Sequence, residues 1–334
     1  MSEKIKVGVY GAAGYAGQDM VELLLNHPHV ELIFATSSTS AGEIVPNTDL
    51  RYVPAGDVTM TDADLVILAL PHGASAVAAK QAVDNGVRVL DLSADMRLDT
   101  AESYKQWYDL DHPHPELLDA PYGLPEINRD ALRNVQKVAV PGCYPTTTLL
   151  GLYPLLAMDA LDANAPIIVD AKSGVTGAGR TPKPNTHFVT VHDNLTPYKT
   201  GRKHRHVGEI EQEIAKITPS HGILIFCPHL LPVARGLMAS IYVTLNHRIT
   251  SDRVHSLYTN HYADEPLVNV LPLGVDAQLK DAVLSNHCTI SITPVTDHQV
   301  HITSVTDNLR KGTASQAIQC LNLMYGFEET LSLI

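Results

Sequence analysis

The chain has 334 residues, of which 45% are hydrophobic, and it carries a formal net charge of −12 at pH 7. This length predicts two domains, or one large α/β domain with an insertion. The acidic balance argues against nucleic acids and acidic membrane surfaces as partners, because both require a broad basic face on the protein. The chain has no apolar run of about 18 residues and enters its first strand without a signal peptide, so we expect a cytoplasmic protein. Its four cysteines lie far apart without paired zinc-ligand spacing, which predicts reduced thiols and no metal site.

The N-terminal segment has the pattern of a βαβ unit. Residues 4–10 and 30–35 are strand-like, and apolar side chains at helical spacing predict a helix over about 14–26. Glycines occupy the turn before this helix, where the missing side chains let backbone N–H groups approach a pyrophosphate. The alternative is that these glycines serve only the packing of the helix against the strand. The candidate cofactor-binding residues of this turn are Gly11, Ala13, Gly14, Tyr15 and Gly17.

The end of the second strand carries hydroxyl groups instead of an acid. An NAD site usually has a carboxylate about 20 positions after the glycines, where it binds the ribose 2′-hydroxyl. Here the strand ends in Thr36, Ser37 and Ser38, whose hydroxyls can bind a 2′-phosphate. The sequence therefore favours NADP(H) over NAD(H).

Two further strands, over 64–70 and 87–93 with a helix between them, extend a parallel sheet. Their carboxyl ends carry Pro71, His72 and Ser93, and ligands bind at that edge of a doubly wound sheet. We therefore add these three residues to the candidate cofactor site. The following "HPHP" stretch, 112–115, is interpreted as an exposed loop.

Cys143 lies between a strand-like segment, 137–140, and a long apolar run with helical spacing. Pro141 and Gly142 break the strand, so Cys143 is expected at a helix N-terminus, and Pro145 is tolerated in a first helical turn. There the helix dipole and unpaired N–H groups lower the pKa of a thiol. The alternative is a small buried side chain, which is the usual role of a free cysteine.

After about residue 165 most segments are strand-like, which predicts an α+β second domain with a mixed or antiparallel sheet. The closing segment from Lys311 has the pattern of an amphipathic helix, and we expect it to pack on the first domain. The expected boundaries are 1–143 with about 310–334 for the first domain, a Rossmann-type doubly wound parallel sheet, and 144–309 for the second.

Residues 172–206 concentrate positive charge, because Asp193 is the only acid among seven basic side chains. One interpretation is a solvated loop. The other is a site for an anionic substrate, since guanidinium groups pair with phosphate and carboxylate. The basic residues are Lys172, Arg180, Lys183, Lys199, Arg202, Lys203 and Arg205.

A helix is expected to start near His206, and histidine is the side chain best suited to proton transfer near neutral pH. His204 and His206 are two residues apart, whereas a helical metal pair needs a spacing of three or four. We therefore expect no zinc site here and interpret His204 as a loop residue.

Taken together, these motifs resemble the N-acetyl-gamma-glutamyl-phosphate reductase family, NADPH-dependent enzymes of arginine biosynthesis within the semialdehyde dehydrogenase superfamily. The resemblance covers nearly the whole chain. The motifs occur in the family's order: "GAAGYAG", "ALPHG", "DLSADMRL", "YGLPEIN", "PGCYPT", "SGVTGAGR", "HRHVGEI", "PHLLPVARG" and "DNLRKG".

The resemblance implies that Cys143 is the nucleophile and His206 the acid/base. It also places Gly11, Gly14, Gly17 and Ser37 in cofactor loops and Asn308, Lys311 and Gly312 near the nicotinamide. In the wider superfamily the catalytic histidine follows the glycine of a "PV..G" segment, whereas Leu237 follows Gly236 here, as in this family. Many relatives have arginine and lysine where this chain has Thr39 and Glu43, so we expect a modest NADP preference.

The implied reaction is that of an NADP-dependent phosphorylating aldehyde dehydrogenase: a small acyl phosphate is reduced to a semialdehyde through a Cys143 thioester. Candidate substrate residues are Arg180, Arg202 and Arg235, and we expect a homodimer or homotetramer. One alternative is the same reaction on a carrier-linked aminoadipyl phosphate or another acyl phosphate. The other is a non-catalytic NADP-binding redox regulator.

Overall fold

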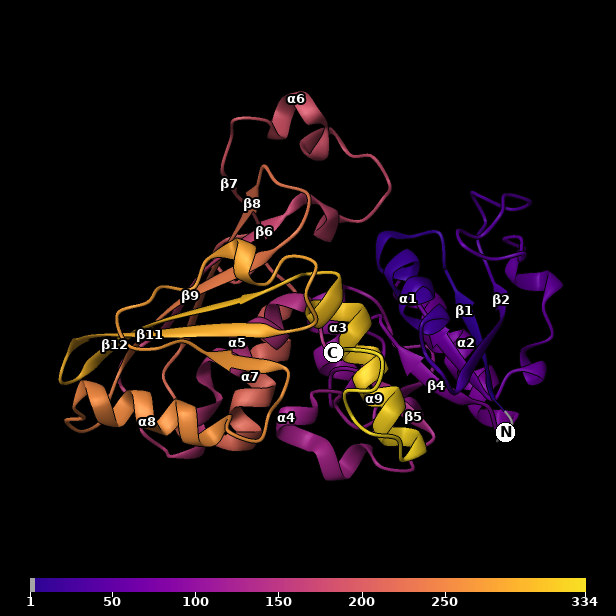
Figure 1. Ribbon diagram of the computed structural model, residues 1–334. Coiled ribbons are helices and arrows are strands. Elements are labelled where there is room, and N and C mark those ends of the chain that lie inside the picture. Colours follow the sequence, from indigo (N-terminus) through magenta and orange to yellow (C-terminus); the bar gives the residue numbers. More distant parts are fainter. Residues whose placement is uncertain (1–3) are drawn as a thin grey trace. The chain divides into compact units, whose positions relative to one another are not determined.

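The computed structural model describes residues 4–334. The chain divides into two compact units (Figure 1). The first unit comprises the described residues up to Gly142 together with Thr313–Ile334, and the second comprises Cys143–Gly312. Among the helices of the described residues, none combines the length and the apolar character needed to cross a membrane.

The first unit is built on a parallel sheet of strand order β2-β1-β3-β4-β5. Its strands are β1 (Ile5–Tyr10), β2 (Val30–Ala35), β3 (Leu65–Leu68), β4 (Arg88–Asp91) and β5 (Lys137–Ala139). The chain moves from β1 outward to β2 and then returns to β3 on the other side of β1. The order of the strands therefore reverses at β1, and ligands bind at such a reversal in doubly wound sheets.

Helices connect these strands and close the core of the first unit. In α2 (Ala74–Asp84) the small residues Ala76, Ala79 and Ala82 are fully buried, which allows the helix to lie close to the sheet. The closing helix α9 (Ser315–Tyr325) packs beside α1 (Tyr15–Leu25). The shorter helices are α3 (Ala101–Tyr108), α4 (Pro125–Asn128), η1 (Ala55–Asp57), η2 (Met60–Asp62), η3 (Pro115–Leu117) and η4 (Arg129–Leu132).

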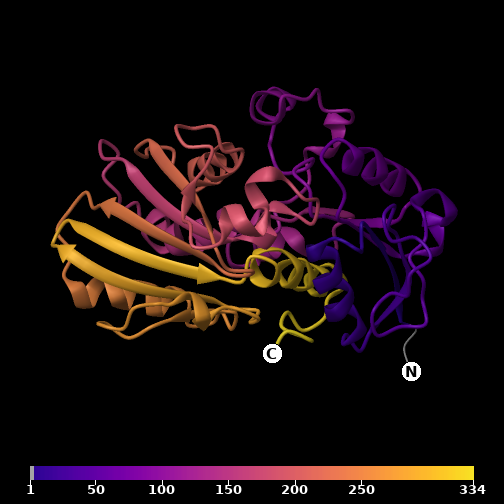
Figure 2. The ribbon, with the colours of Figure 1, turned by 90° about the horizontal axis from the view of Figure 1, so that it is seen from above.

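The second unit contains a mixed seven-stranded sheet of order β10-β11-β12-β9-β6-β8-β7. The β6–β8 and β10–β11 pairs are parallel and the others are antiparallel. Figure 2 shows the long strands β11 and β12 side by side. The strands are β6 (Ile167–Gly174), β7 (Thr196–Pro197), β8 (Leu224–Leu231), β9 (Leu237–Thr244), β10 (Val268–Val270), β11 (Cys288–Thr296) and β12 (Gln299–Thr306). A parallel first sheet and a mixed second sheet confirm the expected fold class.

Helices cover one face of the second sheet. These are α5 (Cys143–Ala157), α7 (His206–Ile217) and α8 (Ser251–His261), and Gly151 of α5 lies against Ile241 and Ile302. The alternate residues point to the opposite face and are partly exposed, as the burial pattern of β6 shows. We call this the open face; it includes Ile168, Asp170, Lys172, Ile225, Cys227, His229, Met238, Tyr242 and His301.

Helix α5 is apolar on all sides and is almost entirely buried, as such a helix must be. Pro154 lies inside it and has no N–H to give to the carbonyl of Leu150. The hydroxyl of Tyr262, at the end of α8, donates to that carbonyl oxygen instead (2.5 Å). The Tyr258 hydroxyl similarly donates to the carbonyl of Gly151 (2.7 Å). The end of α8 therefore supplies donors to two carbonyl oxygens of the helix that begins at Cys143.

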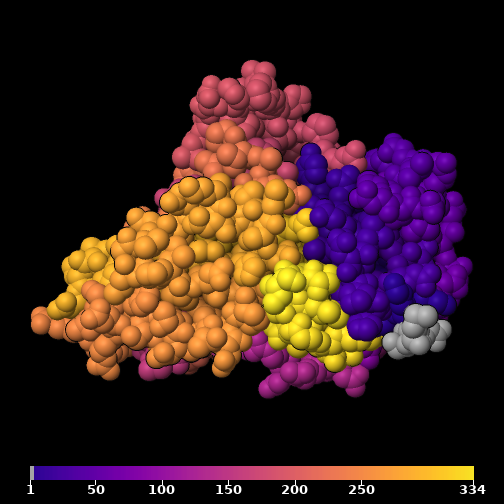
Figure 3. Space-filling view, viewed as in Figure 1, coloured from indigo at the N-terminus to yellow at the C-terminus, as the bar shows by residue number. Residues whose placement is uncertain are grey.

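The remaining helices of the second unit are short. They are η5 (Val175–Ala178), η6 (Pro184–Thr186), α6 (Phe188–Val191) and η7 (Leu279–Asp281), and a π-helix, η8 (Arg310–Ala314), follows β12 and runs across the boundary between the units. The segment that contains α6 extends beyond the ends of β6 and β8 (Figure 1) and forms a protruding surface of the second unit, rose-coloured in Figure 3.

Candidate active site

The glycine turn after β1 has the backbone of an anion-binding loop. Gly11 has φ +74°, and a Cβ there would lie 2.3 Å from the carbonyl oxygen of Ala69 at the end of β3. A Cβ on Gly17 would lie 2.6 Å from the carbonyl oxygen of Gly11. Gly14 is the N-cap of α1 and has no side chain to cap it. The first N–H groups of α1 are thus open to a phosphate, so these residues fit a dinucleotide.

The hydroxyls at the end of β2 are partly used by the fold itself. The Thr36 hydroxyl accepts a hydrogen bond from Gly11 N (3.2 Å), and Ser37 Oγ accepts from Ser40 N (3.1 Å). An accepting hydroxyl still has its own proton to donate, so Ser37 can bind a phosphate oxygen. Ser38 is exposed.

Two buried carboxylates hold the ends of β3 and β4 together, and the sequence analysis missed both. Asp95 Oδ2 accepts hydrogen bonds from the N–H groups of Gly73 (2.7 Å) and Ala76 (2.8 Å), at the start of α2. Ser93 is buried and links the Asp91 carboxylate to the backbone of Asp95, because its hydroxyl donates to Asp91 Oδ2 and accepts from the Asp95 N–H. The two acids four residues apart in "DLSAD" are the sequence feature that could have indicated this pair.

Burial raises the pKa of Asp91 to about 6, against the opposing effect of hydrogen bonds from Ser75 and Ser93. His72 lies in the same loop, where its Nδ1 accepts from Ala94 N (3.2 Å), and Pro71 beside it is exposed. Ser93 is thus a scaffold residue of this loop, whereas Pro71 and His72 stand at its surface.

Cys143 is the first residue of α5, as the sequence predicts, and its side chain is partly exposed. The backbone of Gly312 lies directly against it, since a Cβ on that glycine would be 2.9 Å from the Cβ of Cys143. The hydroxyl of Tyr198 donates to that of Tyr144 (3.2 Å), next in the chain to Cys143. Burial raises the pKa of Tyr144, so its hydroxyl stays protonated.

His206 is the first residue of α7, which packs against α5. Its ring centroid lies 6.0 Å from that of Tyr144 and 4.9 Å from that of His204. The starts of these two helices thus bring the two predicted catalytic residues into one neighbourhood, with the Tyr144 ring in contact with the histidine.

His204 lies in the loop before α7, as expected, but it is not exposed to solvent. It is buried among the rings of Tyr144, Tyr198 and Phe226, and its Nδ1 accepts from His206 N (3.2 Å). Burial, followed by the neighbouring His206, lowers its pKa to about 2. His204 is therefore a neutral part of the core.

Pro113 and Pro115 of the "HPHP" stretch are exposed, as predicted, whereas His112 is buried and its ring contacts Tyr104. Its Nε2 also forms a short hydrogen bond with the carbonyl of Asp95. Both histidines contact aromatic rings, and the local sequence does not predict these contacts.

The structure separates the three arginines proposed for the substrate. Arg202 pairs with both carboxylate oxygens of Glu211 (2.7 Å each), and Arg235 lies 3.4 Å from the fully buried Asp307. Arg180 is exposed.

A different basic group gathers just before α7. The pKa of Lys199 is lowered by burial and by the charges of Arg205 and Lys183, which shows that these cations lie close together. Arg205 directly precedes His206 and is the N-cap of α7. Lys183, Lys199 and Arg205 are therefore anion-binding candidates that the sequence analysis left among seven basic residues.

Asn308 and Lys311 flank the start of the π-helix and are buried. The side-chain oxygen of Asn308 accepts from Gly236 N (2.8 Å), and its amide donates to the Thr176 hydroxyl (2.9 Å). Asp307 Oδ1 accepts from the N–H groups of Leu309 and Arg310, which fixes the turn into the π-helix.

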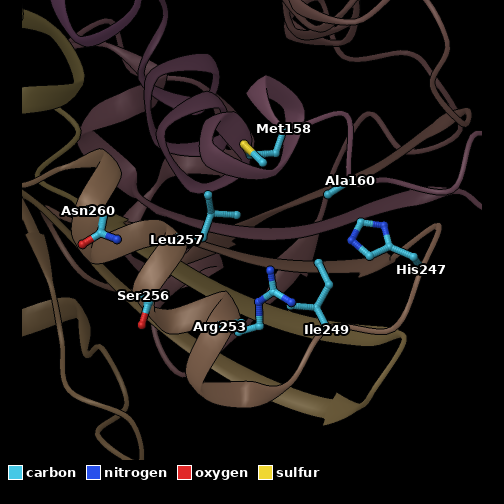
Figure 4. A pocket seen from close by; sticks show the side chains of 8 residues that line it. All are labelled: Met158, Ala160, His247, Ile249, Arg253, Ser256, Leu257 and Asn260. Atoms are coloured by element: carbon cyan, nitrogen blue, oxygen red, sulfur yellow. The ribbon is translucent and has the colours of Figure 1, made fainter.

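A cavity of about 300 Å³ in the second unit contains none of these residues. In Figure 4 Leu257 lies near Met158 and Arg253 lies beside Ile249. Its lining is mostly apolar, and it is completed by Ala160, His247, Ser256 and Asn260.

Family models match both parts of the chain. Residues 6–135 match the semialdehyde dehydrogenase NAD binding domain, and residues 143–308 match the semialdehyde dehydrogenase dimerisation domain. Among solved structures, aspartate semialdehyde dehydrogenase II from Vibrio cholerae has a TM-score of 0.76 at 20% identity, covering 97% of this chain and 99% of its own. The enzyme from Candida albicans has a TM-score of 0.71 at 17% identity, over 97% and 99%. These likenesses establish the fold.

Sequence relatives establish the family. N-acetyl-gamma-glutamyl-phosphate reductase of Desulforudis audaxviator is 42% identical over 99% of this chain and 98% of its own length. The protein of the same name from Clostridium beijerinckii is 41% identical over 97% and 96%. The chain belongs to the N-acetyl-gamma-glutamyl-phosphate reductase family of semialdehyde dehydrogenases.

Proposed function

We propose that this chain reduces N-acetyl-gamma-glutamyl phosphate to N-acetylglutamate 5-semialdehyde and inorganic phosphate in arginine biosynthesis, with NADPH as the reductant. The family supports the substrate, since the relatives that carry this name match nearly the whole chain. The observation that carries the mechanism is Cys143, the first residue of α5, lying against the Gly312 backbone beside the Tyr144 and His206 neighbourhood.

The start of α5 favours a thiolate at Cys143, because N–H groups and the helix dipole stabilise negative charge there. The sulfur attacks the carbonyl carbon of the acyl phosphate, and the backbone N–H groups stabilise the oxyanion. As the bond from carbon to the phosphate oxygen breaks, phosphate leaves with the electron pair and a thioester remains. Lys183, Lys199 and Arg205, together with Arg180, are the candidates for binding the anionic substrate.

Bound NADPH supplies the hydride that reduces the thioester carbonyl carbon. The glycine loop of α1 and the hydroxyls of Ser37 and Ser38 are the groups proposed to hold it. His206 gives a proton to the oxygen of the resulting thiohemiacetal and takes it back as the carbon–sulfur bond breaks. The semialdehyde leaves, and Cys143 returns as a thiolate.

We also propose that the expected homodimer or homotetramer forms through the open face of the second unit. The matched domain model is named for dimerisation. Ile225 and Tyr242 on this face are 46% and 44% exposed in the single chain, an apolar area that a second copy can bury.

Replacing Cys143 with Ser tests the mechanism. A serine hydroxyl is almost wholly protonated near neutral pH, so the variant should bind NADPH and form no acyl-enzyme. Intact-protein mass spectrometry with the acyl phosphate and no NADPH should show a thioester on the wild type only. Cys227→Ser is the matched control, because Cys227 is also partly exposed, and it should still acylate. An adduct on another cysteine would contradict the assignment.

Comparing semialdehydes in the reverse direction completes this test. Phosphate-dependent NADP reduction should be fastest with N-acetylglutamate semialdehyde. A preference for an aminoadipate semialdehyde would favour the alternative substrate. Absence of turnover with every semialdehyde would favour the non-catalytic regulator.

A further inference from the structure

Three side chains of different chemistry meet on the open face of the second sheet. Asp170 lies in the middle of β6, and Cys227 is its partner in register on the parallel neighbour β8. His229 is two residues further along β8 and therefore points to the same face. The sheet register thus brings together a carboxylate, a thiol and an imidazole that are separated in sequence.

The potential ligand atoms of these residues are close enough to share one ion. One carboxylate oxygen, the thiol sulfur and one ring nitrogen all lie within 4.8 Å of one another. Ligands of a tetrahedral zinc ion lie about 3.3 to 3.8 Å apart, given bonds of about 2.0 to 2.3 Å. The atoms therefore need to approach by at most about 1.5 Å, which side-chain rotation provides.

The carboxylate of Asp170 has one oxygen to spare. Its Oδ1 is buried, lies 3.2 Å from Nδ1 of His229, and accepts no hydrogen bond. Its Oδ2 is held by the Lys172 ammonium at 2.7 Å. A buried carboxylate oxygen without a donor costs free energy, and a cation removes that cost.

The orientation of the histidine suits a metal ligand. Nδ1 of His229 lies 3.2 Å from the carbonyl oxygen of Ala171, and when Nδ1 donates its proton to that oxygen the lone pair that can bind a metal is on Nε2. On β9, the neighbours of Asp170 and Lys172 in register are Ser240 and Met238, which carry no charge. Lys172 is consequently the residue of β6, β8 and β9 whose positive charge repels a bound cation.

We propose that Asp170, Cys227 and His229 form a binding site for one divalent transition-metal ion, with Zn²⁺ as the ion that their chemistry fits best. A thiolate and an imidazole select zinc and its neighbours over Mg²⁺ and Ca²⁺, which prefer all-oxygen sites. Three protein ligands leave one position of a tetrahedral site for a further ligand. The bound ion links β6 to β8. Because the thiol releases its proton on binding, the affinity falls as the pH is lowered.

Co²⁺ is the probe for this site, because a thiolate bound to it gives a charge-transfer absorption in the near ultraviolet. The titration uses chelator-treated Cys143→Ser protein, so that the active-site candidate contributes nothing. One equivalent of Co²⁺ per chain should produce the band. Adding Cys227→Ser should abolish the band, and adding Cys288→Ser, which changes a buried cysteine outside the cluster, should leave it intact. No band in the parent, or an unchanged band in the Cys227 variant, overturns the proposal.

Lys172→Met gives a test that does not depend on a loss of function. Removing the ammonium frees the carboxylate and removes a repulsive charge, so the Kd for Co²⁺ should fall by about tenfold. Zn²⁺ should raise the Tm of this variant more than that of the parent at equal concentration. An unchanged or weaker affinity in Lys172→Met would show that the metal is bound elsewhere.

Discussion

His204 and His206 stand two residues apart but occupy different environments. His204 is enclosed by Tyr144, Tyr198 and Phe226, whereas His206 begins α7 beside the Tyr144 ring. His204 also accepts a hydrogen bond from the backbone N–H of His206, so it positions the residue proposed for proton transfer. The pair thus divides into a buried structural residue, His204, and the residue proposed for proton transfer, His206.

Replacing His206 with Asn should lower turnover by roughly 10²- to 10⁴-fold, the usual contribution of a positioned acid or base. The affinity for NADP should change little, because His206 is not part of the glycine loop that is proposed to bind NADP. Steady-state kinetics and cofactor titration by fluorescence separate the two effects. His192→Asn is the matched control, since that histidine is exposed on the same basic segment, and its turnover should equal that of the wild type. Equal activity of His206→Asn would mean that water or another group moves the proton.

The buried His204 also makes stability depend on pH. Its folded-state pKa of about 2 is far below the ordinary value of 6.5, so between these values only the unfolded chain takes up the proton. The contribution of His204 to the free energy of unfolding is complete above pH 6.5. It decreases as the pH is lowered below 6.5, by up to about 1.4 kcal/mol per pH unit. Urea unfolding of wild type and His204→Asn from pH 7.5 to 5 measures the difference in slope. Parallel curves would contradict the assignment of a neutral buried imidazole.

At the scale of elements, the π-helix η8 and the start of α5 meet at a single glycine. A Cβ on Gly312 would lie 2.9 Å from the Cβ of Cys143 and 3.1 Å from the carbonyl oxygen of Asp307. Such distances are too short for carbon, and the turn is fixed by the buried Asp307 carboxylate, so the π-helix cannot simply move away. Cys143 and the π-helix therefore hold each other in place.

Gly312→Ala should displace Cys143 and lower both its alkylation rate by iodoacetamide and the turnover, by at least about tenfold for a shift near 1 Å. Peptide mass spectrometry follows the alkylation of each cysteine separately. Gly56→Ala is the control, because no atom lies within 4 Å of a Cβ at that position and its φ is not positive. Unchanged reactivity of Cys143 in Gly312→Ala would show that the contact is not tight.

The parts of the structure that could be predicted from sequence are those that depend on neighbouring residues. The bounds of β1, α1, β2 and the start of α5 depend on neighbouring residues, so periodicity and Gly or Pro positions predicted them closely. The pairing of Arg202 with Glu211 and the capping of α2 by Asp95 depend on residues that only the fold brings together. The sequence therefore predicted a cluster of basic residues, but it did not predict which of them form ion pairs within the fold.

At the scale of the whole molecule, the open face of the second unit is partly exposed in the single chain at Ile225 and Tyr242, whereas Ala277 and Ala282 pack against it at Met238. Ile168, Ile225 and Tyr242 adjoin one another in register across β6, β8 and β9, and the ring of His301 stacks on Tyr242 at 4.7 Å. Helices cover the opposite face of the same sheet. Burying apolar side chains on this face gives a driving force for self-association of about 25 cal/mol per Å².

Ile225→Glu should therefore shift the protein to smaller species in sedimentation velocity at micromolar concentration. A carboxylate buried in an interface must lose its hydration without an ion partner, which costs several kcal/mol and weakens association by at least about 100-fold. The fold should survive, because Ile225 is 46% exposed in the single chain. Met158→Glu provides the control, since Met158 is 63% exposed but lies after α5, away from the open face, and its variant should sediment like the wild type. If Ile225→Glu keeps the wild-type sedimentation coefficient, the assembly uses a different surface; if Met158→Glu alone dissociates, that surface includes the end of α5.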